Sequence, residues 1–223
     1  MKTALGPETP NYFIGEAARY LRAPYSTVYA WSIGRVGASA SPALIVLADP
    51  NTPLLSFSNL VELHVIQAMR KCHNLSTQTI RKGITYLGRK LGVKRPLLDQ
   101  EMLTNGKDLL IERLGQLVNI SSNGQMHLRE AIESSLARVE RDDSGLYSRM
   151  FPFTRPGRDD PKLVTLNPYV CSGRPCVVGT RLPTNVIASR HRAGDGIMFL
   201  ADDYSIDVEK IEEAIRYESR IAA

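Results

Sequence analysis

The side chains best suited to chemistry in this sequence are two arginines in turns near its C-terminal end. Arg174 lies in the turn Ser172-Gly173-Arg174-Pro175, and Arg181 ends the short stretch Gly179-Thr180-Arg181. A guanidinium is planar and presents a fixed fork of N–H donors, so an arginine on a turn is suited to bind carboxylate or phosphate groups. The alternative is that both arginines pair with the acidic helices predicted to follow them.

The other candidate groups do not combine into a catalytic or metal site. Cys171 and Cys176 have C-x4-C spacing with His191 further on, but a zinc site requires a fourth ligand, so we expect buried thiols. The pairs Asp202-Asp203 and Glu212-Glu213 consist of adjacent residues, which point to different faces of a helix and make poor acid–base partners. The sequence also lacks a P-loop, a dinucleotide fingerprint and a serine elbow. We therefore expect a binding protein without enzymatic activity, cofactor or metal.

The two arginines are predicted to lie in a small β-hairpin followed by three short helices. The expected strands are residues 163–166 and 176–178, with the turn of Arg174 between them. The expected helices begin near Thr184, where Pro183 pre-sets the helical φ angle, at residues 197–203, and after the capping residue Asp207. Because the last two helices are rich in Asp and Glu, electrostatics favours a protein partner over DNA for this end of the chain.

The order of motifs in this segment resembles a known family. NPYVCSGRPCVVGTRLPTNVIASRHRAG, LADDY and SIDVEKIEEAIRYE follow one another, and residues 161–218 are similar to the small antitoxin-associated family of unknown function that is linked to VapB-type antitoxins. Such antitoxins neutralise VapC-type PIN-domain ribonucleases, whose active sites gather carboxylates around Mg²⁺ or Mn²⁺. The resemblance implies that Arg174 and Arg181 bind the toxin.

Charge is distributed unevenly along the chain. Residues 1–96 hold 12 Lys and Arg against 4 Asp and Glu, a net charge of +8, whereas residues 97–223 hold 16 against 19. A basic first half on an otherwise acidic chain predicts a polyanionic partner for that half alone. The alternative is a solvated basic surface without a partner.

The first part of the basic half predicts a helix-turn-helix. Residues 13–21 form the first expected helix, Arg22-Ala23-Pro24 breaks it, and a second helix restarts with Ser26 or Thr27 as its N-cap. In that arrangement the second helix enters the major groove of DNA. The candidate DNA-binding residues are Arg22, Ser26, Thr27, Tyr29, Arg35, Arg81 and Lys82. A plain helical hairpin with no nucleic acid is the alternative.

The rest of the basic half predicts a wing and two more helices. Residues 43–48 and 54–57 are apolar runs around a Pro-rich turn and predict a β-hairpin; Asn59, with Glu62 three residues on, predicts the start of a helix to residue 71. Ile80, Ile84, Leu87 and Leu91 form the apolar stripe of the next helix, which Gly92 ends. This order over residues 12–92 resembles MerR-like winged-helix domains, although the spacer over residues 32–42 departs from them and no effector pocket is evident.

Residues 93–160 carry no recognisable chemistry. Residues 102–110 and 117–121 predict strands around an Asn105-Gly106 turn, and Leu128, Ile132, Leu136 and Val139 predict a helix. Three prolines and mixed charge predict a linker over residues 151–161. The predicted organisation is a MerR-like domain at 1–96, a hairpin-and-helix bridge at 97–150, the linker, and an antitoxin-associated domain at 162–223. The fold class is α+β and mostly helical.

The sequence therefore predicts an antitoxin that binds a VapC-type PIN-domain toxin and represses its own operon through operator DNA. We expect a homodimer, because helix-turn-helix proteins usually bind symmetric half-sites as dimers. A stand-alone winged-helix regulator without a toxin is the main alternative, and a protein–protein adaptor is a third. The sparse cysteines and the absence of a long apolar run or a signal peptide predict a soluble, cytoplasmic protein.

Overall fold

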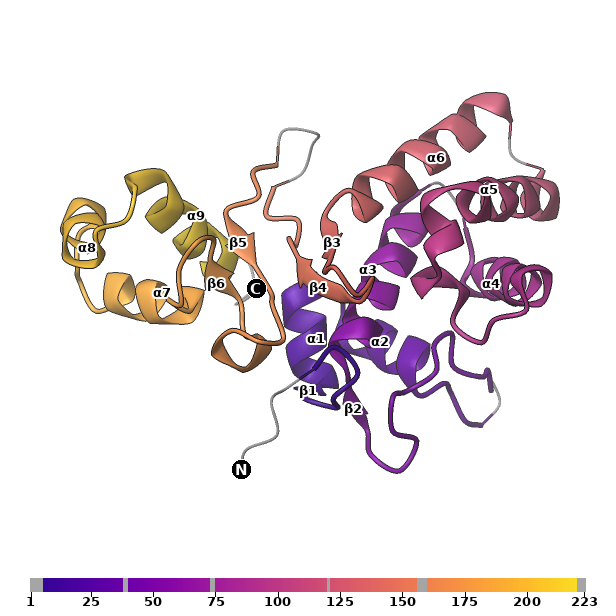
Figure 1. Cartoon of the computed structure of the whole chain (residues 1–223), viewed down its shortest axis with the longest axis horizontal. Helices are drawn as coiled ribbons and strands as arrows, with labels where there is room; N and C mark the ends of the chain where they lie inside the picture. The colour runs from indigo at the N-terminus through magenta and orange to yellow at the C-terminus, as the bar shows by residue number, and fades with distance from the viewer. Residues whose placement is uncertain (1–5, 38–39, 73–74, 120, 156–159, 220–223) are drawn as a thin grey trace.

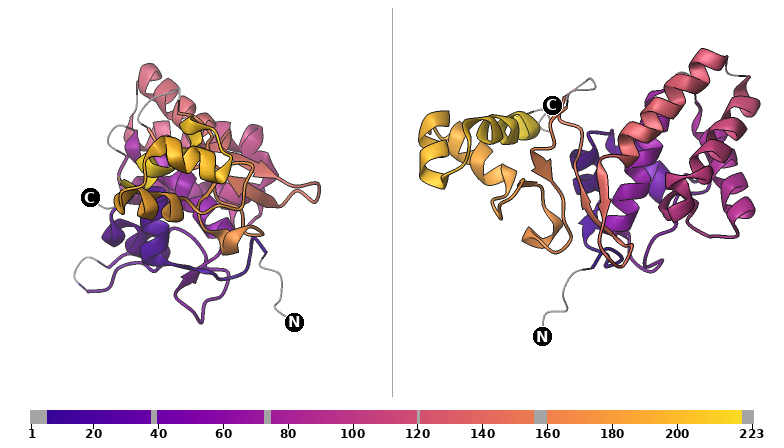
Figure 2. Two further views of the ribbon diagram at one scale, coloured as in Figure 1. Left: turned by 90° about the vertical axis from the view of Figure 1, so that its left-hand side faces the viewer. Right: turned by 45° about the horizontal axis from the view of Figure 1, so that its top comes forward.

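The computed structural model describes residues 6–37, 40–72, 75–119, 121–155 and 160–219. Over these residues the chain is mostly helical, with two-stranded antiparallel sheets, which confirms the predicted mainly helical α+β class. Figures 1 and 2 show two lobes that meet beside α1. We call residues 6–150 the N-terminal lobe and residues 164–219 the C-terminal lobe. None of the described helices is long and apolar enough to span a membrane.

The N-terminal lobe is organised around one buried helix, α3. In chain order its elements are β1 (Tyr12–Phe13), α1 (Ile14–Leu21), α2 (Tyr25–Ser32), β2 (Leu54–Leu55), α3 (Phe57–Lys71), α4 (Thr77–Leu91), short 3-10 helices at Pro96–Leu98 and Gln100–Leu103, α5 (Asn105–Val118), α6 (Ser122–Leu136), β3 (Val139–Arg141) and β4 (Tyr147–Met150). Every side chain of α3 from Phe57 to Met69 is buried, and α1, α4 and α6 all pack against it. A helix that is apolar on all its faces, or whose polar side chains have their hydrogen bonds made, is buried and forms the centre of a core.

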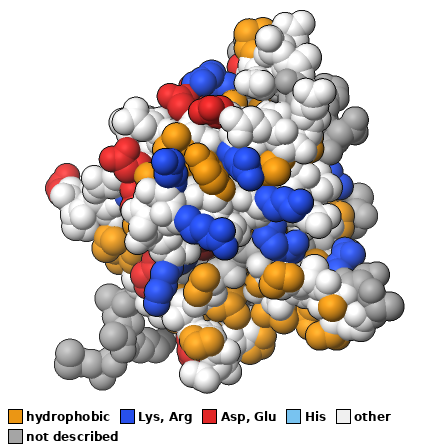
Figure 3. Space-filling model, turned by 90° about the vertical axis from the view of Figure 1, so that its right-hand side faces the viewer, with side chains coloured by type: hydrophobic (Ala, Val, Ile, Leu, Met, Phe, Trp, Pro, Cys, Tyr) orange, Lys and Arg blue, Asp and Glu red, His pale blue; other side chains and the backbone are white. Residues whose placement is uncertain are grey.

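The predicted helix with the apolar stripe is α4, and its signals are confirmed. The Ser76 hydroxyl accepts a hydrogen bond from the Thr79 amide at 3.0 Å, and Gly92 ends the helix in the left-handed region at φ 71°. Ile80, Ile84 and Leu87 are buried on one face. Figure 3 shows Lys and Arg side chains gathered on the face of the molecule where α4 and α5 lie.

The predicted wing hairpin is not formed. β2 pairs with β1, joining the start of α1 to the start of α3, and residues 43–48 adopt no strand. Residues 43–48 instead form an irregular segment that packs against α2. The Leu44 amide donates to the Trp31 carbonyl at 2.7 Å, and the side chains of Leu44 and Ile45 are buried. The winged-helix comparison therefore depends on the α1–α2 pair and not on a hairpin.

The strands predicted between residues 102 and 121 are also wrong, because this segment forms α5. Leu110, Ile111 and Leu114 are buried on one face of the helix, against α4. The Asn105-Gly106 pair was interpreted as a hairpin turn, whereas it forms the first turn of α5. Gly106 lies so close to the Glu101 carbonyl that a Cβ would come within 2.7 Å of its oxygen, so the glycine serves close packing.

Two predicted helix starts are displaced. α2 begins at Tyr25 after Pro24, so Ser26 and Thr27 lie inside the helix and do not cap it. α3 is capped by Ser56, whose hydroxyl accepts from the Asn59 amide at 3.1 Å. Asn59, the predicted cap, is thus the third helical residue, where its side chain completes the capping box, and the actual cap lies three positions earlier than predicted.

The C-terminal lobe follows the predicted order and has a separate core. Its elements are β5 (Val164–Thr165), a 3-10 turn (Cys171–Gly173), β6 (Cys176–Val177), α7 (Thr184–Arg192), α8 (Ile197–Tyr204) and α9 (Val208–Ser219). β5 and β6 pair antiparallel. Val177, Ile187, Leu200 and Ile211 are fully buried in a cluster distinct from that of the N-terminal lobe.

The two lobes meet at Arg22 and Tyr217. The Tyr217 side chain is fully buried, and its hydroxyl donates to the Tyr20 carbonyl at 3.2 Å. The Arg22 guanidinium lies 5.0 Å from the centre of the Tyr217 ring and donates to the Tyr217 and Thr154 carbonyls at 3.1 and 2.6 Å. In the turn between β5 and β6, the Gly173 carbonyl accepts a hydrogen bond from the Tyr12 hydroxyl at 3.3 Å.

The segment predicted to be a linker is held against the N-terminal lobe in its described part. Phe151, Thr154 and Asp160 are buried. Arg138, 5% exposed, donates to the carbonyls of Phe151, Pro152 and Asp160 and forms an ion pair of 3.3 Å with the Asp160 carboxylate. With a further bond of 3.3 Å to the Pro161 carbonyl, one buried guanidinium thus binds four carbonyls and a carboxylate, and it holds the described residues on both sides of this segment against the N-terminal lobe.

Replacing Arg138 by methionine should strongly destabilise the protein, because it leaves four carbonyls without this donor and removes the only cation paired with the Asp160 carboxylate among the described residues, which keeps hydrogen bonds from Thr154 and Arg155 alone. We expect a loss of about 3–5 kcal/mol in the free energy of unfolding, measured by urea titration. Arg149→Met is the matched control, since Arg149 and its partner Glu140 are each 45% exposed and such a pair contributes about 1 kcal/mol or less. Equal losses in the two variants would contradict the structural role of Arg138.

Gly173 and Gly179 form a second matched pair, since their φ angles are nearly equal at +77° and +79°. A Cβ on Gly173 would lie 2.0 Å from the Tyr12 hydroxyl oxygen, whereas a Cβ on Gly179 would meet nothing within 4 Å. Gly179→Ala should cost about 1–2 kcal/mol through the left-handed backbone alone. Gly173→Ala should cost about 1–3 kcal/mol more through overpacking at the junction. Denaturant titration of both variants measures the difference, and equal costs would show that this contact does not hold the lobes together.

Candidate functional site

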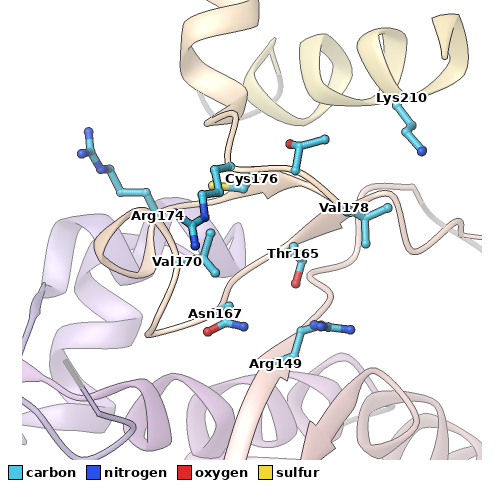
Figure 4. A pocket seen from close by; sticks show the side chains of 11 residues that line it. Arg149, Thr165, Asn167, Val170, Arg174, Cys176, Val178 and Lys210 are labelled. Atoms are coloured by element: carbon cyan, nitrogen blue, oxygen red, sulfur yellow. The ribbon is translucent and has the colours of Figure 1, made fainter. Parts of the chain in front are cut away.

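A cavity of about 580 Å³ opens beside the β5–β6 hairpin. We call it the hairpin cavity. It is lined by Arg149, Thr165, Asn167, Val170, Arg174, Cys176, Val178, Gly179, Thr180, Arg181 and Lys210. Figure 4 shows Arg149 on β4 and Lys210 on α9, with the β5–β6 hairpin between them. The structure therefore brings the two predicted arginines, Arg174 and Arg181, to one cavity and adds two cations to them.

Arg174 is positioned by an unusual turn. Cys171, Ser172 and Gly173 all have positive φ angles, of 49°, 57° and 77°, which reverses the chain before β6. Arg174 follows in an extended conformation, and its Nε donates to the Cys171 carbonyl at 3.3 Å. The guanidinium keeps its other donors, because this bond uses only one of its five N–H groups. Arg174 is exposed at the surface.

Arg181 is carried by the turn that leaves β6. The Thr180 hydroxyl donates to the Val177 carbonyl at 2.9 Å and accepts from the Leu182 amide at 3.0 Å, which closes the turn around Gly179. The Arg181 carbonyl accepts from the Cys171 thiol at 3.0 Å, so the two turns of the hairpin are tied together. The Arg181 side chain itself is exposed.

The two added cations belong to weak surface pairs. Arg149 bonds Glu140 at 3.0 Å, and Lys210 bonds Asp207 at 3.0 Å, with Asp207 75% exposed. Exposed pairs of this kind contribute little, so either cation can exchange its partner for a bound anion at small cost. Sequence reasoning missed both residues. The strand that carries Arg149 was not predicted, and the helix that carries Lys210 was predicted without the packing that turns this residue toward the hairpin.

The electrostatic character of the hairpin cavity is uniform, since no acidic residue is among those that line it. Within the described residues, neither Arg174 nor Arg181 forms a salt bridge to the acidic helices α8 and α9. The alternative that these arginines pair with those helices therefore has no supporting contact there. Four cations around one cavity can bind a compact group with two or more negative charges.

The remaining candidates for chemistry have structural surroundings. Burial raises the pKa of the Cys176 thiol to about 12, with a further contribution from the hydrogen bond to Cys171, so this thiol stays protonated and is a poor nucleophile. The Glu213 carboxylate is fully buried and bonds Arg155 at 2.5 Å, while Asp203 bonds Arg190. Among the described residues, no three His, Cys, Asp or Glu side chains are grouped to hold a metal ion.

The residues predicted to contact DNA fall into two groups. Ser26 and Tyr29 are exposed on α2, and Lys82 is exposed on α4. Thr27, Arg35 and Arg81 lie together around a second cavity, between α2 and the first turn of α4. The helices α1 and α2 pack against each other as the predicted helix-turn-helix requires.

Arg22 is the exception among these residues. Its guanidinium is directed at the junction between the lobes, where it binds two carbonyls and the face of Tyr217. Arg22 itself ends α1 in the left-handed region at φ 54°. The half-buried Arg22 side chain thus uses donors on carbonyls at the junction, and its predicted contact with DNA stays a prediction.

One family model matches the C-terminal lobe, and two relatives match nearly the whole chain. Residues 164–217, nearly all of the C-terminal lobe, match the family model described as "Protein of unknown function (DUF433)". The chain is 26% identical to the "Putative antitoxin VapB45" of Mycobacterium tuberculosis, over 93% of each protein. It is also 26% identical to the "Uncharacterized protein Rv2308" of the same organism, over 92% of this chain and 89% of that protein.

A solved structure is similar over nearly the whole chain. The crystal structure of Rv2018 from Mycobacterium tuberculosis superposes with a TM-score of 0.70, at 22% sequence identity, and covers 93% of this chain and 98% of that one. At this identity the likeness establishes a shared fold. The hairpin cavity thus lies in a chain similar in fold to Rv2018 and similar in sequence to a protein named as an antitoxin.

Proposed function

We propose that this chain is the antitoxin of a toxin–antitoxin pair, which binds and neutralises a VapC-type PIN-domain ribonuclease. The observation that carries the proposal is the hairpin cavity, where Arg174, Arg181, Arg149 and Lys210 surround a space lined by no carboxylate. Similarity over 93% of the chain to a protein named as an antitoxin supports it. The role is one of binding, and the chain performs no turnover of its own.

The chemistry of the partner fits the cavity. The resemblance of the C-terminal segment to antitoxin-associated domains implies a ribonuclease whose active site gathers carboxylates around a divalent metal ion. A guanidinium binds such carboxylates through paired N–H bonds and neutralises their charge. Arg174 and Arg181 are exposed and form no salt bridge to a described carboxylate, so they enter the toxin, while Arg149 and Lys210, which pair with Glu140 and Asp207, extend the positive field.

The N-terminal lobe supplies the second part of the proposal, repression of the operon through operator DNA. The α1–α2 pair serves as a MerR-like helix-turn-helix, and the basic skew of residues 1–96 supplies phosphate contacts. A symmetric operator is bound by two copies, so the acting species is a homodimer. The basic face in Figure 3 favours the second candidate function, a DNA-binding regulator without a toxin.

Co-expression with the neighbouring gene product tests the toxin-binding role. Arg174→Ala and Arg181→Ala should each leave the melting temperature unchanged, because both side chains are exposed. Each should weaken toxin binding by about 2–5 kcal/mol, the usual cost of truncating one partner of a buried charged pair. Growth rescue and co-purification are the measurements. Arg192→Ala is the matched control, since Arg192 is an exposed arginine of α7 that does not line the hairpin cavity.

Three outcomes separate the candidate functions. Rescue by the wild type and by Arg192→Ala, with loss in the cavity variants, supports the proposal. Full rescue by both cavity variants would show that the hairpin cavity does not bind the toxin. A neighbour that is not toxic and does not co-purify would leave the regulator without a toxin, and binding to the upstream promoter would then be measured.

A further inference from the structure

A second cavity, of about 560 Å³, is formed where four segments of the N-terminal lobe meet. We call it the α4 cavity. It is lined by Thr27, Ala30, Trp31, Arg35, Ala40, Ser41, Pro42, Arg70, Thr77, Gln78 and Arg81. These residues come from α2, the segment after it, the end of α3 and the first turns of α4. Three of them are arginines from three different segments, and none is acidic.

Each of the three arginines is held by backbone contacts. Arg70 donates to the Leu75 carbonyl at 2.8 Å, and Arg81 donates to the Pro42 carbonyl at 2.8 Å. Arg35 is fixed through its main chain, which exchanges hydrogen bonds with Ser41 at 2.7 and 3.0 Å. A guanidinium has five N–H donors, so one bond to a carbonyl positions Arg70 or Arg81 and leaves most donors available. The cavity therefore contains two positioned guanidinium groups, together with the exposed side chain of Arg35, whose main chain alone is fixed.

The unused donors and the local charge indicate an anionic ligand. The Nε of Arg81 is buried and has no hydrogen-bond partner among the described residues. No salt bridge joins Arg35, Arg70 or Arg81 to a described carboxylate, and the sequence contains no Asp or Glu from residue 63 to residue 98. Hydroxyls of Thr27, Ser41 and Thr77 add further donors to the lining. A buried donor without a partner is costly, so an anion bound beside the Arg81 Nε would offset that cost.

We propose that the α4 cavity binds a backbone phosphate of duplex DNA and thereby sets the position of α2 on the operator. The proposal rests on the DNA-binding part of the proposed function and identifies Arg70, together with Arg35 and Arg81, as the phosphate clamp. A phosphate has several oxygens that can accept from the three guanidinium groups at once. Phosphate contacts of this kind fix the register of a protein on DNA without reading the sequence.

Two neighbouring features favour nucleic acid over an isolated anion. Lys82, Arg89 and Lys90 are exposed on α4, the helix that carries Arg81, and Figure 3 shows Lys and Arg side chains on the face where α4 lies, so a second and third phosphate would also meet positive charge. On the other side, Tyr25 and Tyr29 are 56% and 42% exposed and line an adjoining groove with Ser26 and Arg35. Exposed rings and hydroxyls beside a phosphate site suit contacts with sugars and base edges.

The experiment measures duplex DNA binding by the full-length chain over a range of salt concentrations. The probes are the promoter duplex and an unrelated duplex of equal length, and the variants are Arg70→Gln, Arg81→Gln and Arg35→Gln. Each variant should weaken binding to both duplexes alike and lower the slope of log K against log salt concentration by about 1, the effect of one lost phosphate contact. Arg192→Gln removes the same charge from the C-terminal lobe and should leave the slope unchanged. Thermal melting of each variant confirms that it is folded.

A separate titration with inorganic phosphate identifies the source of the anion. Phosphate should compete with the duplex for the wild type and not for Arg70→Gln. Phosphate binding without any effect of the three variants on duplex affinity would overturn the proposal and leave a site for the free ion. Slopes as unaffected in the cavity variants as in Arg192→Gln would also overturn it. A wild type that binds no duplex would refute the DNA-binding role itself, while toxin rescue through Arg174 and Arg181 is scored independently.

Discussion

The burial of Tyr217 beneath the Arg22 guanidinium is the contact on which the arrangement of this protein depends. Apart from Leu166, which packs in the core of the N-terminal lobe, the two lobes have separate apolar cores, and side chains of α1, of β1 and of the residue before β1 also contact the C-terminal lobe through hydrogen bonds and an ion pair. Arg22 binds carbonyls on both sides of the junction, while the Tyr217 hydroxyl bonds the Tyr20 carbonyl. Because the hairpin cavity takes Arg149 from the N-terminal lobe and its other cations from the C-terminal lobe, its shape depends on this junction.

The junction also keeps two electrostatic environments apart. The α4 cavity lies in a part of the chain with no acidic residue from position 63 to position 98, where a long polyanion can lie on the surface without repulsion. The hairpin cavity has acidic helices beside it, with Asp203 and Glu213 already paired to arginines. An extended nucleic acid would be repelled there, whereas a compact group of carboxylates fits. Charge placement thus favours a different partner for each lobe.

Capping residues, turn residues and apolar stripes predicted the helices and strands well where the residues that form them pack against residues close by in the sequence. Gly92 and the apolar stripe that starts at Ile80 predicted α4, and the C-terminal hairpin and helices were predicted in their correct order. The failures came from segments whose packing partners are distant in sequence. Residues 43–48 are apolar because they cover α2, and Asn105-Gly106 allows a close approach to the Glu101 carbonyl, so neither marks a hairpin. For the candidate sites, the sequence identified Arg174, Arg181, Arg35 and Arg81, and it missed Arg149, Lys210 and Arg70 because tertiary packing alone brings them in.

Arg22 shows why charge alone cannot assign an arginine to a binding surface. In the sequence it lies between two helices of a helix-turn-helix pattern, where a phosphate contact is the natural interpretation. In the structure its left-handed backbone, at φ 54°, ends α1 and directs the chain into α2, while its side chain fixes α9 through Tyr217. A guanidinium that satisfies buried carbonyls cannot be released to a partner without leaving those carbonyls unpaired. The residue therefore positions both candidate sites, α2 through its backbone and the hairpin cavity through its side chain.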